Sequence, residues 1–154
     1  MGQIEKRLEK LGIQLPTPPK KAGLYAQTRR MGCAVYVSGC GPDLNGVEKY
    51  KGRLGVLSME DGQKAARQCV LNALAILQRE LGTLDRVKGV MKMLVFVASE
   101  RDFWEQPLVA NGASQLLMDV FGEECGCPTR SAVGMWVLPG DIPVEIEMMV
   151  QIEE

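Results

Sequence analysis

The segment from Val144 to Ile152 alternates between apolar and polar residues for most of its length. Its apolar positions, which share one face of a strand, are Val144, Ile146, Met148, Val150 and Ile152. The positions between them are Glu145, Glu147, Met149 and Gln151. Because side chains of a strand point alternately to the two faces of a sheet, only the first face can pack under helices. The second face needs other surroundings, and a subunit interface, a ligand cleft or plain solvent would each account for it.

Two longer segments carry apolar residues at helical spacing. The first follows Ser58, a typical helix N-cap, and runs to Gly82, where a glycine in the left-handed conformation would end it. Small residues on its apolar stripe predict close packing against a sheet. A second helix is predicted over residues 108–121, ending at Gly122, and a short amphipathic helix over residues 3–11.

The predicted strands are rich in β-branched or apolar residues and comprise residues 24–31, 33–37, 50–56, 87–97, 130–138 and 144–152. The second closes at Ser38-Gly39, the fourth is the central strand, and Pro139-Gly140-Asp141 turns the chain between the last two. The order is therefore helix, three strands, helix, strand, helix and two strands. It predicts an α+β domain with a mixed sheet of four to six strands and helices on one face.

The 154 residues suit one domain with a short N-terminal extension. Residues 1–19 hold the N-terminal helix and a proline-rich linker, and residues 20–154 hold the domain. The N-terminus is charged, and no apolar run approaches the ~20 residues that span a bilayer. We therefore expect a cytoplasmic protein without a membrane partner.

The chain contains no histidine, which removes several classes of catalytic site. Ser-His-Asp and Cys-His mechanisms need an imidazole as base, and His-based zinc sites need it as a ligand. Five scattered cysteines do not form the pattern of a disulfide framework. Cys125-Gly126-Cys127 could bind a soft metal or form a redox pair, but an ordinary loop is the better interpretation, since no second pair completes a site. A net charge of −1 makes nucleic acid a poor partner.

Arg130-Ser131-Ala132-Val133-Gly134, Leu138-Pro139 and Val144-Glu145-Ile146-Glu147 follow one another in the last predicted strands. Earlier in the chain stand Tyr25-x-Gln27 and Tyr36-Val37-Ser38-Gly39. From about residue 23 to the C-terminus, the chain resembles the RidA/YjgF family, the reactive intermediate deaminases that are also labelled L-PSP endoribonucleases. The resemblance implies a chorismate-mutase-like fold and a homotrimer whose sheets face a central barrel. Ligand sites would then lie in the clefts between subunits.

The resemblance also implies an activity and the residues that perform it. Members of the family hydrolyse 2-enamine or 2-imine acids to 2-keto acids and ammonia, and the resemblance implies no cofactor and no metal. Arg130 matches the arginine that holds the substrate carboxylate, because a planar guanidinium can bind both oxygens. Glu145 matches the acid that positions or activates water, and its pKa would rise in a partly dry cleft. We expect this pair on two neighbouring C-terminal strands.

Four further positions match residues that line the family's ligand pocket: Tyr25, Ser38, Gly39 and Asn111. Tyr25 would close over the ligand, the backbone at Ser38 and Gly39 would line the pocket, and Asn111 would face it from a helix. Each assignment has a plainer alternative. These alternatives are a salt bridge for Arg130, solvent exposure for Glu145, simple packing for Tyr25 and a helix start for Asn111.

The chain departs from the family at two positions near this site. Ala132 stands where a cysteine is usual, and Cys40 replaces a common glutamine after Ser38-Gly39. A non-catalytic module that binds a small carboxylate in the same cleft is therefore the second hypothesis. Endoribonuclease or translation-inhibitor activity is a weaker third, because the chain lacks histidine and carries a net charge of −1.

Overall fold

The computed structural model describes residues 2–153, and within them the chain forms one mixed sheet with helices on one side. The strands are β1 (Thr28–Met31), β2 (Ala34–Cys40), β3 (Val87–Ala98), β4 (Thr129–Met135) and β5 (Val144–Ile152). The helices are α1 (Gln3–Lys10), α2 (Met59–Leu81), α3 (Gln106–Phe121) and α4 (Glu123–Gly126), with 3-10 turns η1 (Leu84–Arg86) and η2 (Pro139–Asp141). The predicted α+β class and the one-sided arrangement are confirmed.

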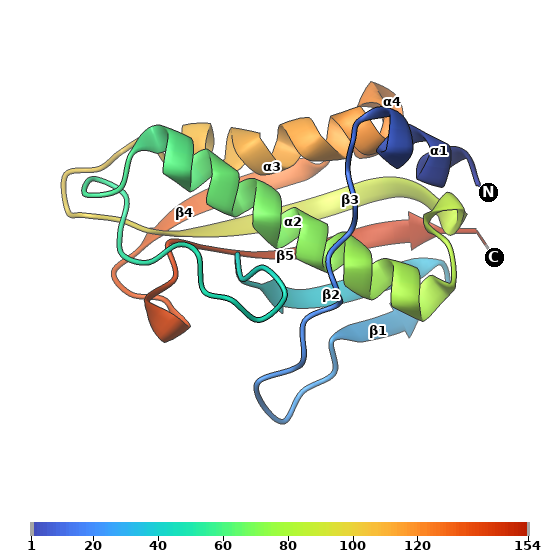
Figure 1. Cartoon of the computed structure of the whole chain (residues 1–154), viewed down its shortest axis with the longest axis horizontal. Helices are drawn as coiled ribbons and strands as arrows, with labels where there is room; N and C mark the ends of the chain where they lie inside the picture. Colours follow the sequence, from blue (N-terminus) through green and yellow to red (C-terminus); the bar gives the residue numbers. More distant parts are fainter. Residues whose placement is uncertain (1, 154) are drawn as a thin grey trace.

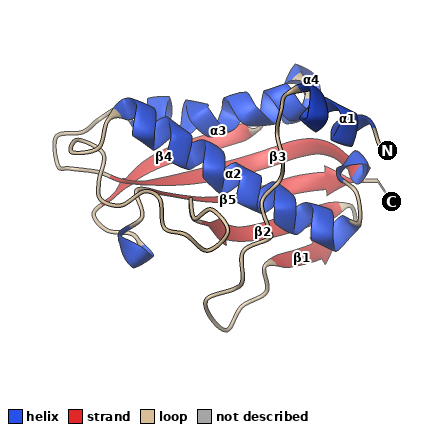
Figure 2. Cartoon of the chain, viewed as in Figure 1, coloured by secondary structure: helices blue, strands red, loops and turns tan. Residues whose placement is uncertain are grey.

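The order of strands across the five-stranded sheet of residues 2–153 is β1-β2-β5-β3-β4. β3 and β4 are parallel and are joined through α3, whereas every other neighbouring pair is antiparallel. α2 and α3 lie side by side across one face of the sheet (Figure 1), and the colouring in Figure 2 shows the helices together on that side. The apolar positions of β5 are buried under them, as the alternation predicts.

The other face of the sheet, which we call the open face, has no cover within residues 2–153. Its side chains include apolar groups that remain exposed: Met31, Tyr36, Val133 and Met135. A shallow hollow of about 280 Å³ crosses it, lined by residues of β2, β3 and β5 that include Tyr36, Lys92, Leu94, Glu147 and Met149. Exposed apolar side chains on a sheet face are typical of a surface that meets a partner.

The two long helices begin and end at residues that the sequence identifies. The Ser58 hydroxyl accepts a hydrogen bond from the Asp61 N–H at 3.1 Å, and Gly82 ends α2 in the left-handed conformation with φ 80°. α3 ends at Gly122 as predicted but begins two residues early, at Gln106. Pro107 fits that first turn because the N–H it lacks would have no intrahelical partner there.

Two strands predicted in the N-terminal half of the chain differ in the structure. One does not form, and the other starts later than predicted. Residues 50–56 form no strand: Leu54 makes only isolated bridges, to Leu57 and Ser99, and Gly52 and Gly55 have φ of 95° and 101°, which break an extended run. β1 starts at Thr28 rather than residue 24, because the chain turns before it, with the Tyr25 hydroxyl accepting from the Ala22 N–H at 3.4 Å.

Two other strand ends were predicted incorrectly. β2 does not close at Ser38-Gly39 but continues to Cys40, which pairs with Ile146 after a register shift. β4 ends at Met135 rather than residue 138, because its neighbour β3 ends at Ala98 and the last bond between them runs from the Ser99 N–H to the Met135 carbonyl.

The N-terminal helix α1 packs beside η1 and α3. The Asp85 carboxylate accepts from the backbone N–H groups of Gln3 and Ile4 at 2.9 and 2.7 Å. Leu8 is buried in the main core. A carboxylate at a helix N-terminus satisfies donors that the helix cannot, so Asp85 fixes where α1 begins.

Gly112 sets the distance between α2 and α3, and with it the position of the residues that precede it on α3. A Cβ at position 112 would overlap the backbone carbonyl of Gln63 on α2. We expect Gly112→Ala to lower the free energy of unfolding by about 1–3 kcal/mol through overpacking, measured by urea denaturation. Gln115→Ala on the exposed side of α3 should stay within about 0.5 kcal/mol of the parent. A Gly112→Ala protein as stable as the parent would contradict close packing here.

Candidate functional site

Glu145 lies in the wall of a cavity of about 600 Å³ at the end of β2 and β5. Its strand position places it on the open face, since Val144 and Ile146 on either side are buried under the helices. Gly39 makes room for it, because a Cβ at position 39 would overlap the Glu145 Oε1 atom. Tyr25 and Ser38 also line the cavity. These four residues, which we call the Glu145 half-site, are therefore brought together as the sequence predicts.

The electrostatics of Glu145 suit a proton-transfer role. Burial, and then the charge of Glu147, raise the pKa of its half-buried carboxyl above the ordinary value. No hydrogen bond from residues 2–153 reaches this carboxylate. An acceptor that is partly dry, unpartnered and open to a cavity is available to a ligand or a water molecule.

Hydrogen bonds hold residues 19–27, which precede β1, at the edge of the Glu145 cavity. The Ser38 hydroxyl donates to the Ala26 carbonyl at 2.6 Å, and the Gln27 amide donates to the Pro19 carbonyl at 2.8 Å. Arg79 of α2 in turn donates to the Gln27 side-chain oxygen at 3.0 Å. These bonds fix the backbone on both sides of Tyr25, whose ring stays partly exposed at the cavity edge.

Cys40 takes no part as a nucleophile in this arrangement. Its buried thiol donates to the Ser38 carbonyl at 3.4 Å. Burial, and then the nearby charge of Glu145, raise the pKa of the Cys40 thiol to about 12. Because the thiolate is the reactive form of cysteine, this thiol is inert at neutral pH.

Arg130 extends from β4 towards α3, on the helix side of the sheet. Its guanidinium donates to the Asn111 side-chain oxygen at 2.9 Å, to the Ser114 hydroxyl at 3.0 Å and to the Pro107 carbonyl at 3.2 Å. All three acceptors are neutral, and Arg130 is in no salt bridge within residues 2–153. The guanidinium is thus oriented without being neutralised, which leaves its charge for an anion. We call Asn111, Ser114 and Arg130 the Arg130 half-site.

Ser114 is the one side chain of this half-site that the sequence analysis did not select. It stands three residues after Asn111 on α3, and residues three apart lie on the same face of a helix. That spacing, together with the predicted helix, could have identified it.

The two half-sites are far apart in one chain, so the expectation that Arg130 and Glu145 lie on neighbouring strands is wrong. β3 lies between β4 and β5, with Met93 opposite Arg130 on one side and Phe96 opposite Glu145 on the other. Arg130 and Glu145 are separated by two strand spacings across the sheet and by three residues along β3. Their Cα atoms therefore lie roughly 14 Å apart. The side chains also point to opposite faces of the sheet. One chain therefore presents both parts of the predicted pair but cannot combine them.

Other candidate features of the sequence do not form sites. Within residues 2–153, no group of three or more cysteine or acidic side chains is arranged to hold a metal ion. Cys125 and Cys127 are free thiols on and just after α4. None of the helices in the same part of the chain combines the length and the apolar character that a membrane span requires.

The fold and the two half-sites can now be compared with known proteins. The family model described as "YjgF/chorismate_mutase-like, putative endoribonuclease" matches residues 5–150. The chain belongs to the RidA/YjgF family. This assignment confirms the resemblance carried by the motifs around Arg130, Glu145 and Ser38.

The relatives of this RidA/YjgF chain include proteins with and without a named activity. Protein TCP17 from Trypanosoma cruzi is 43% identical over 154 residues, covering 98% of this chain and 95% of the relative. The crystal structure of Atu1372 from Agrobacterium tumefaciens is 40% identical with a TM-score of 0.89, covering 97% of this chain and 92% of that one. A 2-iminobutanoate/2-iminopropanoate deaminase from Dermatophagoides farinae is 28% identical, covering 92% and 95%.

The raised pKa of Glu145 gives a test of the Glu145 half-site that does not depend on activity. A ¹³C NMR titration of the carboxyl groups should show Glu145 titrating above the ordinary glutamate range, and Glu147→Gln should lower its pKa by removing a like charge. Glu153→Gln, at the far end of β5, should leave the Glu145 titration unchanged.

The same shift has a consequence for stability. A carboxyl that binds its proton more tightly when folded contributes stability at low pH, which is lost as the pH rises through its folded pKa. Glu145→Gln should therefore be more stable than the parent at pH 7, and this difference should disappear below the ordinary pKa of glutamate. Equal stability at pH 7, or an ordinary Glu145 pKa, would contradict the partly dry cavity.

Proposed function

We propose that three copies of the chain assemble with their open faces turned inwards around a central barrel, and that each cleft between copies joins the two half-sites. Arg130 would come from one copy and Glu145 from the next. The uncovered apolar side chains of the open face support this arrangement. So does the sheet order, because β3 keeps the two residues apart within a chain. A closed cyclic assembly gives every cleft the same composition.

In this cleft the protein hydrolyses small 2-imino or 2-enamino acids to 2-keto acids and ammonia, in the cytoplasm and without a cofactor. The observation that carries the proposal is the Arg130 guanidinium, which three neutral acceptors orient but do not neutralise. A planar guanidinium of this kind binds a carboxylate through two parallel hydrogen bonds. The deaminase from Dermatophagoides farinae shows that a relative acts on 2-imino acids.

Glu145 supplies the proton transfers of the proposed reaction. The substrate reacts as its protonated iminium form, and the Glu145 carboxylate takes a proton from a water molecule as the water oxygen bonds to the iminium carbon. The protonated carboxyl gives this proton to the nitrogen of the carbinolamine so formed. The carboxylate then takes the hydroxyl proton as the C–N bond breaks, which leaves the 2-keto acid, and it passes that proton to the departing ammonia. A carboxyl with a raised pKa is better suited to these steps than an ordinary glutamate, because its affinity for the proton is closer to neutral pH.

Mixed assemblies test the shared cleft and the activity together. Arg130→Ala and Glu145→Gln should each reduce hydrolysis of 2-aminoacrylate or 2-iminobutanoate by at least ~100-fold, as the loss of a substrate anchor or a general base does. When the two variants are unfolded together and refolded at equal ratio, about one quarter of the clefts regain both native residues in a random cyclic assembly. Activity should then recover to about one quarter of the parent, measured as ammonia release.

A single-chain site would give no recovery on mixing, and light scattering that shows a monomer would remove the shared cleft. Gln115→Ala serves as a folded control with full activity. Unchanged turnover in Arg130→Ala would remove the assigned substrate anchor.

A non-catalytic binding module is the alternative function, supported by Ala132 beside Arg130 and by the inert Cys40 thiol. Calorimetric binding of 2-keto acids that is lost in Arg130→Ala, with no imine hydrolysis by the parent, would favour it. Ribonuclease or translation-inhibitor activity has weaker support, since the chain has no histidine and a net charge of −1.

A further inference from the structure

Residues 136–143, which we call the β4–β5 connection, contribute part of the wall of the Glu145 cavity. Pro139, Gly140 and Ile142 of this connection line the cavity. The connection turns sharply, with φ of 69° at Gly140 and 57° at Asp141, a value that costs energy for a residue with a side chain. Its large side chains Trp136 and Val137 are 61% and 65% exposed, so burial anchors the connection only further along, at Leu138 and Pro143.

Polar contacts from residues 51–53 also hold the connection, including its exposed Trp136 end. The Lys51 ammonium donates to the Gly140 carbonyl at 3.2 Å, and the Gly52 N–H donates to the Asp141 carbonyl at 2.8 Å. Arg53 then reaches the other end of the connection. Its guanidinium donates to the Trp136 carbonyl at 3.3 Å and stacks over the Trp136 ring at 4.3 Å.

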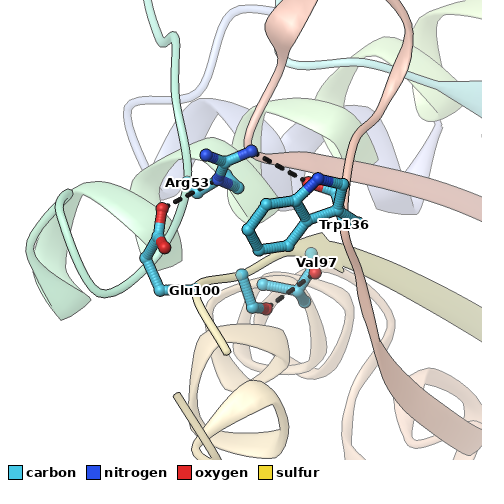
Figure 3. A network of polar contacts seen from close by, with 5 residues as sticks. Arg53, Val97, Glu100 and Trp136 are labelled. Carbon is cyan, nitrogen blue, oxygen red and sulfur yellow. Dashed lines mark hydrogen bonds and ion pairs between the residues drawn. The ribbon is translucent and has the colours of Figure 1, made fainter. Parts of the chain in front are cut away.

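Arg53 also joins this wall to the end of β3, as Figure 3 shows. Its Nε donates to the Glu100 carboxylate at 2.8 Å in a partly buried ion pair. The next residue, Leu54, is fully buried, and backbone bonds of 2.8 Å tie it to Ala98 and Glu100. One side chain therefore links the exposed Trp136 end of the connection to the end of β3 through three contacts: the ion pair with Glu100, the hydrogen bond to the Trp136 carbonyl and the stacking on its ring.

We propose that Arg53 is a positioning residue for the Glu145 cavity, holding the β4–β5 connection in place as its wall. The role rests on the proposed function only in that the cavity is where the substrate binds. No contact of Arg53 with Glu145 is involved, and the effect passes through residues 136–143. Loss of the guanidinium frees the Trp136 end of the connection and lets water enter the cavity.

The test is the titration of Glu145 in Arg53→Ala, followed by ¹³C NMR of its carboxyl group. The groups around it are Glu147 on β5, Cys40 on β2, and Lys20, Tyr25, Asp43 and Glu48 in the cavity lining. Removing the positive charge of Arg53 can only leave the Glu145 pKa unchanged or raise it. Hydration of the cavity lowers it, so a fall in the Glu145 pKa separates the loss of the wall from the loss of a charge.

A matched control is Lys88→Ala, which removes another partly exposed ion pair, with Glu153 at 3.3 Å, at the opposite end of β3. We expect Arg53→Ala to lower the Glu145 pKa and Lys88→Ala to leave it unchanged. In a protein with the proposed activity, Arg53→Ala should also raise KM about tenfold with kcat within about threefold, and the acid limb of kcat/KM should move to lower pH.

An unchanged or raised Glu145 pKa in a folded Arg53→Ala protein overturns the role of Arg53. Should that variant fail to fold, Arg53→Lys keeps a charge for Glu100 but loses the planar group over Trp136. It should lower the Glu145 pKa by a smaller amount, and no change would again overturn the proposal. The NMR result does not depend on whether the parent hydrolyses imines. Failure of the proposed function would appear instead in the activities of the parent and of Arg130→Ala.

Discussion

Strand β3 determines how this protein can build a site, because it separates the strands that carry Arg130 and Glu145. Its pairing with β4 and β5 also fixes the face to which each side chain points. No loop movement within one chain can bring the two groups together while the sheet stays intact. A site that uses both residues would therefore have to combine two copies.

The local parts of this structure could be predicted from sequence, since their causes are local. Alternation along Val144 to Ile152 defines a strand with one buried face, and Ser58 and Gly82 define the ends of α2 through cap chemistry. The same reasoning predicted a strand over residues 50–56, and that strand does not form. Their composition suits a strand, but two glycines with positive φ turn the chain, and its hydrogen bonds go to loop ends that are distant in sequence.

The sequence predicted which candidate side chains lie close together better than it predicted how the two groups are placed in the sheet. Tyr25, Ser38, Gly39 and Glu145 do surround one cavity, and Asn111 does contact Arg130. The error lay in treating strands that are consecutive in sequence as neighbours in the sheet. The parallel β3–α3–β4 unit places β3 between them, and such long-range pairing leaves no mark in the sequence of either strand.

The charges of the two half-sites complement each other, and this bears on how a shared cleft would work. The Glu145 cavity also carries Asp43 and Glu48, and the Asp43 Oδ1 atom is buried without a hydrogen bond from residues 2–153. A carboxylate bound by the Arg130 guanidinium of the next copy would balance its positive charge, so that this charge would not offset the burial of Glu145. Burial, which raises the pKa of Glu145, would then remain the main influence on its proton affinity while a ligand is bound.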